Sequence, residues 1–413
     1  MSFQSSNKRK IINDPVYGFI GIPGDLVFDI IEHPWFQRLR RIKQLGLTHL
    51  VYPAALHTRF QHALGAMHLM GQATEVLRQK GFDISDHEAE SLDLAILLHD
   101  IGHGPYSHAL EHSLIRGLSH EEISLVFMER LNVQFSGGLN TAIEIYKGNH
   151  PRRYLKKLVA SQLDVDRLDY LKRDSFFTGV SEGVISTDRI IKMLNVAGED
   201  LAVEAKGIYS VEKFIMARRL MYWQVYLHKT VLAAEHLLIR ILKRARELSA
   251  SGVPLFSTPA LGFFLSHDTG RAELTGDPEV LENFAAIDDS DIFTSLKVWC
   301  HHPDKVLSAL SKKMVNRQLF RVIMQNEAFD EDRVAQLKQR CAKQFSLQVE
   351  ETAYFVFTDE ITNHAYNPLD DRIQIIQKDG RVCDITESSD QLNVNVLSKN
   401  IRKFFLCYPK ELD

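Results

Sequence analysis

Histidine and carboxylate side chains crowd one short stretch of the 413-residue chain, where His99 and Asp100 end an apolar run before a glycine-rich turn. Successive residues of a helix point about 100° apart, so both side chains reach one ion only if it lies near the helix end. An imidazole and a carboxylate together suit a borderline divalent ion such as Zn, Mn, Fe, Ni or Co. The crowded stretch contains His99, Asp100, His103, His108, Glu111, His112 and His120.

A metal site needs more than these two ligands. A lone His–Asp pair is more often explained by a hydrogen bond at a helix end than by a metal site. The chain offers a third ligand in His62 and a fourth in Asp166, which lies within Leu163–Asp169. The ligand types alone leave both interpretations open, and the metal interpretation depends on three separate segments.

Helical periodicity dominates the first 250 residues and defines the elements that must position these side chains. Apolar residues at three- and four-residue spacing predict a helix over 60–80, which carries His62. A more apolar helix is predicted over 91–100, and a turn containing glycine and proline ends it. Further long helices are predicted over 154–174 and 211–248.

The character of the sequence changes after Phe345. Strands are predicted at 354–357 and 372–376, and Lys378-Asp-Gly380 is a hairpin signal before a strand over 381–385. The predicted fold class is therefore mainly α, with a small α+β lobe at the C-terminus. The predicted organisation is an N-terminal segment over 1–45, a helical core over 46–250, a mixed helical region over 251–345 and the lobe over 346–413.

The overall composition is that of an ordinary soluble globular protein, with 45% apolar and 25% charged residues. No apolar run is long enough to span a membrane, and the polar N-terminus lacks a secretory signal. We therefore expect a cytoplasmic protein without a membrane partner. The formal net charge of -4 argues against nucleic acid as a partner. The scattered cysteines fit a reducing compartment; they are Cys300, Cys341, Cys383 and Cys407.

The sequences that flank the candidate ligands carry a family resemblance. The strings in question are Asn13-Asp-Pro15, Phe36-Gln-Arg-Leu-Arg40, Ile42-Lys-Gln-Leu-Gly46, Arg59-Phe-Gln-His62, His99-Asp-Ile-Gly-His-Gly-Pro-Tyr-Ser-His108 and Asp166-Arg-Leu-Asp-Tyr170. In this order they resemble the HD-domain metal phosphohydrolases, specifically the deoxynucleoside triphosphate (dNTP) triphosphohydrolase branch, which includes the vertebrate enzyme with SAM and HD domains. The match spans about residues 10–235, and we expect no SAM domain before it. The resemblance implies an HD-type helical core and a metal site formed by His62, His99, Asp100 and Asp166.

His108 is the candidate general acid. It lies nine residues after His99, and Glu111 follows three residues later, a spacing at which a carboxylate can orient an imidazole and raise its pKa. A surface His–Glu pair is the alternative. The resemblance favours catalysis, although the family typically has Asp where Glu111 stands. It further implies catalytic roles for residues that face the substrate phosphates, which are Arg59, His103 and His120.

Asp166, Tyr170 and Asp174 are spaced four residues apart and so share one face of a helix. The resemblance implies that Tyr170 and Asp174 contact the deoxyribose, the carboxylate through the 3′-hydroxyl. The other implied substrate contacts are Gln44 and Leu45 at the sugar, Arg167 and Arg218 at the phosphates, and Tyr226 against the sugar. The chain departs from the family at Tyr222, where a His is usual, and at Leu227, where a polar residue is usual, so the family's base preference does not transfer.

A second nucleotide site is also implied by the resemblance. In regulated members an activator nucleotide binds between subunits, and the matching positions here are Lys10, Asn13, Gln37, Arg40, Arg189 and Lys206, with Glu32 where an Asp reads guanine. Surface ion pairs and caps explain the same residues equally well. With an activator, we expect a homo-oligomer, either a dimer or a tetramer, whose activity depends on nucleotide.

These observations predict a dNTP triphosphohydrolase that releases deoxynucleoside and triphosphate. Its expected cofactor is one divalent ion (Fe, Mn, Zn, Ni or Mg), with a second Mg arriving on the substrate phosphates. Two alternatives stay open. One is another HD-type phosphohydrolase, either a monophosphatase or a phosphodiesterase. The other is a non-catalytic nucleotide sensor or single-stranded nucleic-acid binder.

Overall fold

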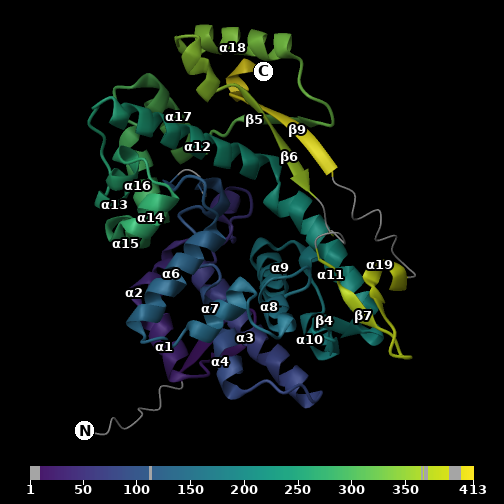
Figure 1. Ribbon diagram of the computed structural model, residues 1–413. Helices are drawn as coiled ribbons and strands as arrows, with labels where there is room; N and C mark the ends of the chain where they lie inside the picture. The colour runs from purple at the N-terminus through teal and green to yellow at the C-terminus, as the bar shows by residue number, and fades with distance from the viewer. Residues whose placement is uncertain (1–9, 111–113, 364–365, 367–370, 390–400) are drawn as a thin grey trace, which may run out of the picture.

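The computed structural model describes residues 10–110, 114–363, 366, 371–389 and 401–413. The chain is mainly helical, as predicted, and Figure 1 shows a helical body, a second group of helices beside it and small sheets at two edges. The helices of the body are α1 (Asp25–Glu32), α2 (Pro34–Gln37), α3 (Arg59–Gln79), α4 (Asp86–Leu98), α6 (His120–Gln134), α7 (Asn140–Lys147), α8 (Arg153–Val159), α9 (Val165–Thr178), α10 (Thr187–Met193) and α11 (Ile208–Met221).

A long helix, α12 (Lys229–Ala250), leads from this body to the second group of helices (Figure 1). That group packs around one end of α12, and α13 and α17 contact it directly. Its members are α13 (Pro259–Ser266), α14 (Arg271–Gly276), α15 (Pro278–Ala286), α16 (Asp289–Trp299) and α17 (Lys305–Val315). Within the described part of the chain, no helix combines the length and the apolar character that crossing a bilayer requires.

The helix that carries His62 begins and ends as predicted, whereas α4 begins at Asp86 rather than at residue 91. At the start of α4, Ser85 N donates to Glu88 Oε2 at 2.9 Å while Glu88 N donates to Ser85 Oγ at 3.2 Å, a reciprocal cap that fixes the first turn. The helix ends at Leu98 and His99 is its C-cap, so the His99–Asp100 pair lies at the helix end as expected. Both α4 and α9 pack against α3, which lies at the centre of the body.

Two helices that were predicted to be continuous are interrupted in the structure. Residues 154–174 form α8 and α9 rather than one helix, because Asp164 caps α9 by accepting from Ser161 N and Arg167 N, both at 2.7 Å. Residues 211–248 are also interrupted: a π-helical turn occupies Tyr222–Tyr226, and α12 begins only after His228. Apolar periodicity continues across both breaks and therefore hides them.

The described part of the chain also forms three small sheets. The first is the hairpin of β1 (Ile11–Asp14) and β2 (Gly18–Gly21). The second has the order β3-β4-β7-β8, formed by Leu194–Ala197, Asp200–Glu204, Gln374–Ile376 and Val382–Asp384. The third has the order β5-β9-β6, formed by Arg321–Gln325, Ile401–Tyr408 and Phe357–Asn363, and it carries α18 (Glu331–Phe345) in Figure 1.

The predicted hairpin at Lys378–Gly380 is confirmed, because β7 and β8 pair antiparallel around it and α19 (Ile385–Ser388) follows. The predicted strand at 354–357 is wrong: Glu350–Tyr354 forms a 3₁₀ turn, and β6 starts only at Phe357. The strands after residue 345 are shared between two sheets. β7 pairs parallel with β4, and β6 and β9 form one sheet with β5.

Candidate metal centre

The structure brings the four predicted ligands together from three segments. His62 projects from α3, Asp166 from the first turn of α9, and His99 and Asp100 from the end of α4. His62 Nε2 lies 3.0 Å from Asp166 Oδ1 and 3.8 Å from Asp100 Oδ2. His99 Nε2 lies 3.4 Å from Asp166 Oδ1 and 3.3 Å from Asp100 Oδ1. Two imidazole nitrogens and two carboxylates therefore face one small volume.

Both imidazoles are oriented so that Nε2 points inward. His62 Nδ1 bonds Asp169 Oδ2 at 2.7 Å, and His99 Nδ1 bonds the carbonyl oxygen of Ile96 at 2.5 Å. A proton on each Nδ1 leaves the Nε2 lone pair for a metal ion. Among the described residues, both Nε2 atoms are buried and make no hydrogen bond of normal geometry, an arrangement that costs stability unless a ligand occupies the site. The donor set fits a divalent ion.

The charge around His62 also favours a cation. In the metal-free chain burial lowers the pKa of His62, but the adjacent carboxylates of Asp166 and Asp169 outweigh burial and raise this pKa to about 10. Burial raises the pKa of Asp100, and the opposing charges of His99 and Arg59 lead the effects that hold it well below its usual range. The carboxylates therefore stay ionised, as metal ligands must be.

Behind His62 lies a chain of buried charges that sequence reasoning missed. Asp169 receives hydrogen bonds from Arg173 Nε at 2.9 Å and Nη2 at 3.0 Å, and Arg173 Nη1 donates to Asp14 Oδ2 of β1 at 2.7 Å. A Cβ on Gly65 would lie 2.1 Å from both Arg173 Nη2 and Asp169 Oδ1, so only glycine leaves room for this pair. The four-residue spacing from Asp169 to Arg173 is the signal that could have found the pair.

Hydrogen bonds from two sides hold the backbone of the turn after Asp100. Arg38, fully buried, donates from Nη1 to the carbonyl oxygen of His103 at 2.8 Å. On the other side, Ser124 Oγ donates to the His99 carbonyl at 2.7 Å and accepts from Gly102 N at 2.9 Å. These bonds fix the backbone that carries His99 and Asp100.

We predict that Gly102→Ala destabilises the protein by about 1–3 kcal/mol, the usual cost of overpacking. The added Cβ would lie 2.3 Å from the His120 carbonyl oxygen and 2.4 Å from Ser124 N, and neither backbone atom can move aside cheaply. Urea unfolding followed by circular dichroism measures the change. Gly71→Ala is the matched control: it lies in a helix with nothing within 4 Å, so it should gain about 0.5–1 kcal/mol. Equal stability of the two variants would show that the turn is not tightly packed.

A second histidine group adjoins the ligands. His103 Nε2 lies 3.4 Å from Asp100 Oδ1, and the rings of His103 and His120 stack at 3.8 Å between centroids. Arg59 is bonded to Asp100 and donates from Nε to Ser107 Oγ at 2.9 Å. Burial and the nearby Arg59 cation hold the pKa of His103 well below its usual range, so its ring is neutral and can hydrogen-bond without repelling an arginine.

The predicted general acid falls where the structure is not described. The backbone at His108 forms a 3₁₀ turn, Ser107–Leu110, directly beside the Arg59 contact. The His108 side chain and the whole of Glu111 lie outside the described residues. Their roles stay predictions.

The predicted sugar-side residues gather around Asp174, which is buried on the same helix as Asp166. Asp174 Oδ1 bonds His57 Nε2 at 2.8 Å, and Tyr226 Oη donates to Asp174 Oδ2 at 2.8 Å. The rings of Tyr170 and Tyr226 meet edge to face at 6.1 Å. His57 was not predicted; its backbone pairs with that of Gln44, whose N donates to the His57 carbonyl at 2.9 Å.

The two predicted phosphate-side arginines lie near this cluster. Arg167 Nε donates to the Ser161 carbonyl at 2.6 Å and to Asp164 Oδ2 at 3.2 Å. Arg218 Nη1 donates to Gln162 Oε1 at 3.2 Å, and its guanidinium lies 5.8 Å from the centre of the Tyr222 ring. Leu45 packs half-buried against the core.

The predicted activator residues form two local pairs. Arg40 Nε donates to Gln37 Oε1 at 2.7 Å, and Arg189 Nη2 donates to the Lys206 carbonyl at 2.9 Å. Within the described ranges no hydrogen bond joins one pair to the other. Lys10 lies over the Phe28 ring at 4.3 Å, and Asn13 belongs to β1. An activator site stays a prediction.

Comparisons with known proteins cover this whole site. Residues 59–174 match the HD domain and residues 185–253 match the HD associated region. The crystal structure of a phosphohydrolase from Bacteroides thetaiotaomicron is 56% identical, with 97% of this chain and 100% of that chain aligned and a TM-score of 0.94. The uncharacterized protein YwfO of Bacillus subtilis is 33% identical over 77% of this chain and 72% of its own length.

Further relatives have an assigned reaction. The deoxynucleoside triphosphate triphosphohydrolase SAMHD1 homolog of Dictyostelium discoideum is 32% identical over 55% of this chain and 48% of its own length. The human deoxynucleoside triphosphate triphosphohydrolase SAMHD1 is 30% identical over 53% of this chain and 42% of its own length. The chain thus spans about half the length of these two triphosphohydrolases.

Proposed function

Because this chain belongs to the HD-domain phosphohydrolases related to SAMHD1, we propose that it hydrolyses dNTPs to deoxynucleoside and tripolyphosphate with the help of a divalent metal ion. The proposal is carried mainly by one observation. A single helix, α9, places the metal-ligand candidate Asp166 and the sugar-contact candidate Asp174 two turns apart on one face. In their proposed roles, these two side chains would meet a phosphate and the sugar of the same substrate.

In this proposal His62, His99, Asp100 and Asp166 hold the ion. Such an ion, when bound, polarises a phosphoryl oxygen and lowers the pKa of water. Arginine side chains of this chain would contact the substrate phosphates. Arg59 stands buried beside Asp100, Arg167 bonds Asp164 and Arg218 bonds Gln162. A guanidinium group can donate two parallel hydrogen bonds to the oxygens of a phosphate. Several arginines can therefore bind the three linked phosphates of a triphosphate.

The leaving oxygen needs a proton. We propose that His108 supplies it to the 5′-oxygen as water attacks the α-phosphorus, with Glu111 orienting the imidazole. His103 and His120 then serve as hydrogen-bond donors to the phosphates beside Asp100. The bond between the α-phosphorus and the 5′-oxygen breaks, and the water oxygen ends on the tripolyphosphate.

Asp174 has the geometry to select the sugar. Its carboxylate is held by His57 and Tyr226, so its position is fixed before a substrate arrives. A fixed carboxylate can accept a hydrogen bond from a 3′-hydroxyl, and Gln44 and Leu45 would stand at the 3′ and 2′ sides of the sugar. A tight wall at the 2′ side would reject ribose sterically.

We predict that Asp174→Asn lowers kcat/KM for dNTPs by about 10- to 100-fold, since hydrogen bonds to charged groups contribute about 1.5–3 kcal/mol. The effect should fall mainly on KM, because the 3′-hydroxyl is remote from the reacting phosphorus. Steady-state kinetics with dGTP and dATP measure it. Asp83→Asn, whose side chain is 98% exposed, is the control and should leave both constants unchanged. Unchanged kinetics of Asp174→Asn would remove Asp174 from the sugar site.

Product analysis tests the proposed reaction. The metal-loaded protein is incubated with each dNTP in turn, and the products are separated by anion-exchange chromatography. Tripolyphosphate with deoxynucleoside is the expected pair. Pyrophosphate with deoxynucleoside monophosphate, or orthophosphate, would contradict the proposal. Faster hydrolysis of deoxynucleoside monophosphates than of triphosphates would instead support the monophosphatase alternative.

A further inference from the structure

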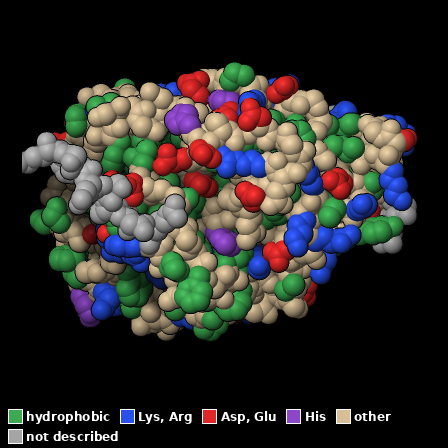
Figure 2. All heavy atoms as spheres, turned by 90° about the horizontal axis from the view of Figure 1, so that it is seen from below, with side chains coloured by type: hydrophobic (Ala, Val, Ile, Leu, Met, Phe, Trp, Pro, Cys, Tyr) green, Lys and Arg blue, Asp and Glu red, His purple; other side chains and the backbone are tan. Residues whose placement is uncertain are grey.

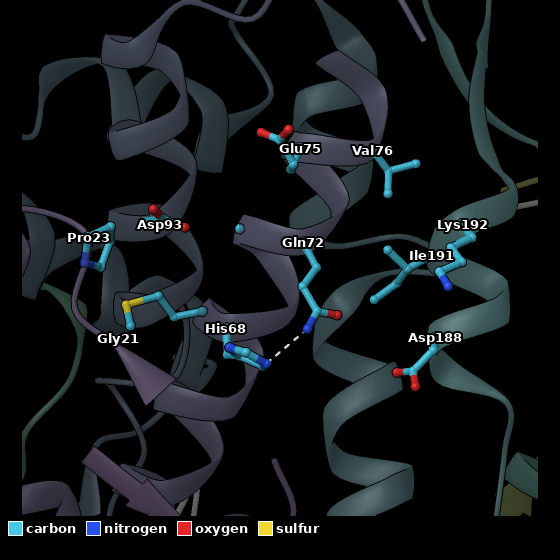
Figure 3. Close-up of a pocket in the computed structure, with 12 residues that line it drawn as sticks. Gly21, Pro23, His68, Gln72, Glu75, Val76, Asp93, Asp188, Ile191 and Lys192 are labelled. Carbon is cyan, nitrogen blue, oxygen red and sulfur yellow. Dashed lines mark hydrogen bonds between the residues drawn. The ribbon is translucent and has the colours of Figure 1, made fainter. Parts of the chain in front are cut away.

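A cleft of about 590 Å³ lies along α3, away from the metal-ligand cluster; we call it the α3 cleft. Figure 3 shows α3 in its middle, with Asp93 of α4 on one side and Asp188 and Lys192 of α10 on the other. Figure 2 views the molecule from the side on which α3, α4 and α10 lie and shows several acidic side chains near the centre of that face. None of the cleft residues takes part in the proposed hydrolysis.

Asp93 is the residue of this cleft whose environment most favours a bound cation. Its side chain lines the cleft although the residue is only 7% exposed, and no hydrogen bond or ion pair to it occurs within the described residues. Burial raises the pKa of Asp93 to about 8, with Glu90 adding to the rise and Arg78 opposing it. A buried carboxyl without a partner is costly, and a cationic ligand would remove that cost.

The charges along the cleft select against anions. Glu75 on α3 and Asp188 on α10 are exposed carboxylates, and Lys192 is the one cationic side chain among the lining residues, all of which are described. The two exposed carboxylates outnumber this one cation, which repels a phosphate and attracts a positive ligand, and a cation placed beside Asp93 would favour its ionised form. His68 at the cleft wall bonds Gln72 at 2.9 Å, and burial lowers the pKa of His68, so it adds no second positive charge near neutral pH.

The spacing of the carboxylates selects against a single metal ion. Among the described residues, only two groups of three ligands lie within 4.8 Å of one another, and both belong to the metal centre and its neighbouring histidines. The cleft carboxylates are spread around α3 instead. An extended ligand with several positive charges can reach these separated carboxylates, whereas a single metal ion cannot.

The walls between the charges are apolar. Met67, Val76, Ile191 and Pro23 line the cleft between its carboxylates. Gly71 lies on α3 without a side chain, and nothing lies within 4 Å of the place where a Cβ would stand, so the helix leaves open space there. Methylene groups can be buried along such a surface at about 0.8 kcal/mol per group.

We propose that the α3 cleft binds a linear aliphatic polyamine, with one ammonium group on Asp93, another near Glu75 or Asp188, and its methylene chain across Gly71. The site is independent of the proposed hydrolysis. Its ligand class follows from charge spread, apolar walls and the buried unpartnered carboxyl together.

Isothermal titration of the full chain with spermidine, at 150 mM salt and without any nucleotide, tests this proposal. We expect saturable binding to one site, and weaker binding of butylamine, which carries one charge. Asp93→Asn keeps the side-chain shape and should weaken spermidine binding at least tenfold. Gly71→Leu should abolish binding by filling the cleft while improving helix propensity. Glu279→Gln, an exposed change on α15, is the control and should bind as the unaltered chain does.

Three outcomes would overturn the proposal. They are the absence of binding at millimolar spermidine, equal binding by Asp93→Asn, and displacement of spermidine by an equal concentration of Mg²⁺. Circular dichroism of both variants shows whether they are folded, and Gly71→Leu tests the cleft without touching the buried carboxyl. Because no nucleotide is present, failure here leaves the proposed hydrolysis unaffected.

Discussion

An Asp166→Asn variant is expected to lose its metal and to hydrolyse dNTPs at least ~1000-fold more slowly, because the stabilisation of several kcal/mol that a catalytic ion gives is lost with it. Asp166 Oδ1 lies 3.0 Å from His62 Nε2 and 3.4 Å from His99 Nε2, so one oxygen closes the site between both imidazoles. The neutral amide is a poor ligand and removes the charge that attracts the ion. Metal content by mass spectrometry and kcat/KM measure the two effects.

Asp86→Asn is the matched control for this change. Its side chain is fully exposed at the start of α4, and the variant should keep both metal and activity. An Asp166→Asn protein that binds a full equivalent of metal and retains normal activity would remove Asp166 from the ligand set.

The second large effect is expected from Arg173→Ala. This change leaves Asp169 and Asp14 as buried carboxylates without their cation, and breaking such a buried pair typically costs about 3–5 kcal/mol. Asp169 would also orient the His62 ring less firmly. Loss of a residue that hydrogen-bonds a metal ligand typically weakens metal binding by about 10- to 100-fold. Urea unfolding and metal titration measure the two effects separately.

Lys172→Ala provides the comparison at the neighbouring position. Lys172 lies half-buried with its ammonium 4.5 Å from the Tyr17 ring, a contact that contributes about 1 kcal/mol or less. If Arg173→Ala is no less stable than Lys172→Ala and binds metal equally well, the buried charge chain does not support the site.

The positions of the ligand candidates on their helices follow from local sequence, whereas their combination into one metal site was expected from the family resemblance. His99 and Asp100 stand at the end of an apolar helix with glycines beyond, and α9 keeps Asp166, Tyr170 and Asp174 on one face by helical spacing alone. The supporting contacts were not predictable in this way. Asp14 meets Arg173 across 159 residues of chain, and His57 meets Asp174 across 117, so neither pair shares a periodic signal.

The pairing of distant strands escaped prediction for a similar reason. The strand over 372–376 and its hairpin were predicted, but β7 also pairs in parallel with β4 although about 170 residues separate them, and no local pattern marks that partner. The helix breaks at Asp164 and His228 depend on side chains that accept backbone N–H groups, and a capping residue inside an apolar pattern is easily taken for a helical one.

The most direct test of the central claim is hydrolysis of a dNTP in oxygen-18-labelled water, followed by mass spectrometry of both products. Attack of water on the α-phosphorus beside the metal places one labelled oxygen in the tripolyphosphate and none in the deoxynucleoside. Label in the deoxynucleoside, or in orthophosphate or a deoxynucleoside monophosphate, would contradict the account.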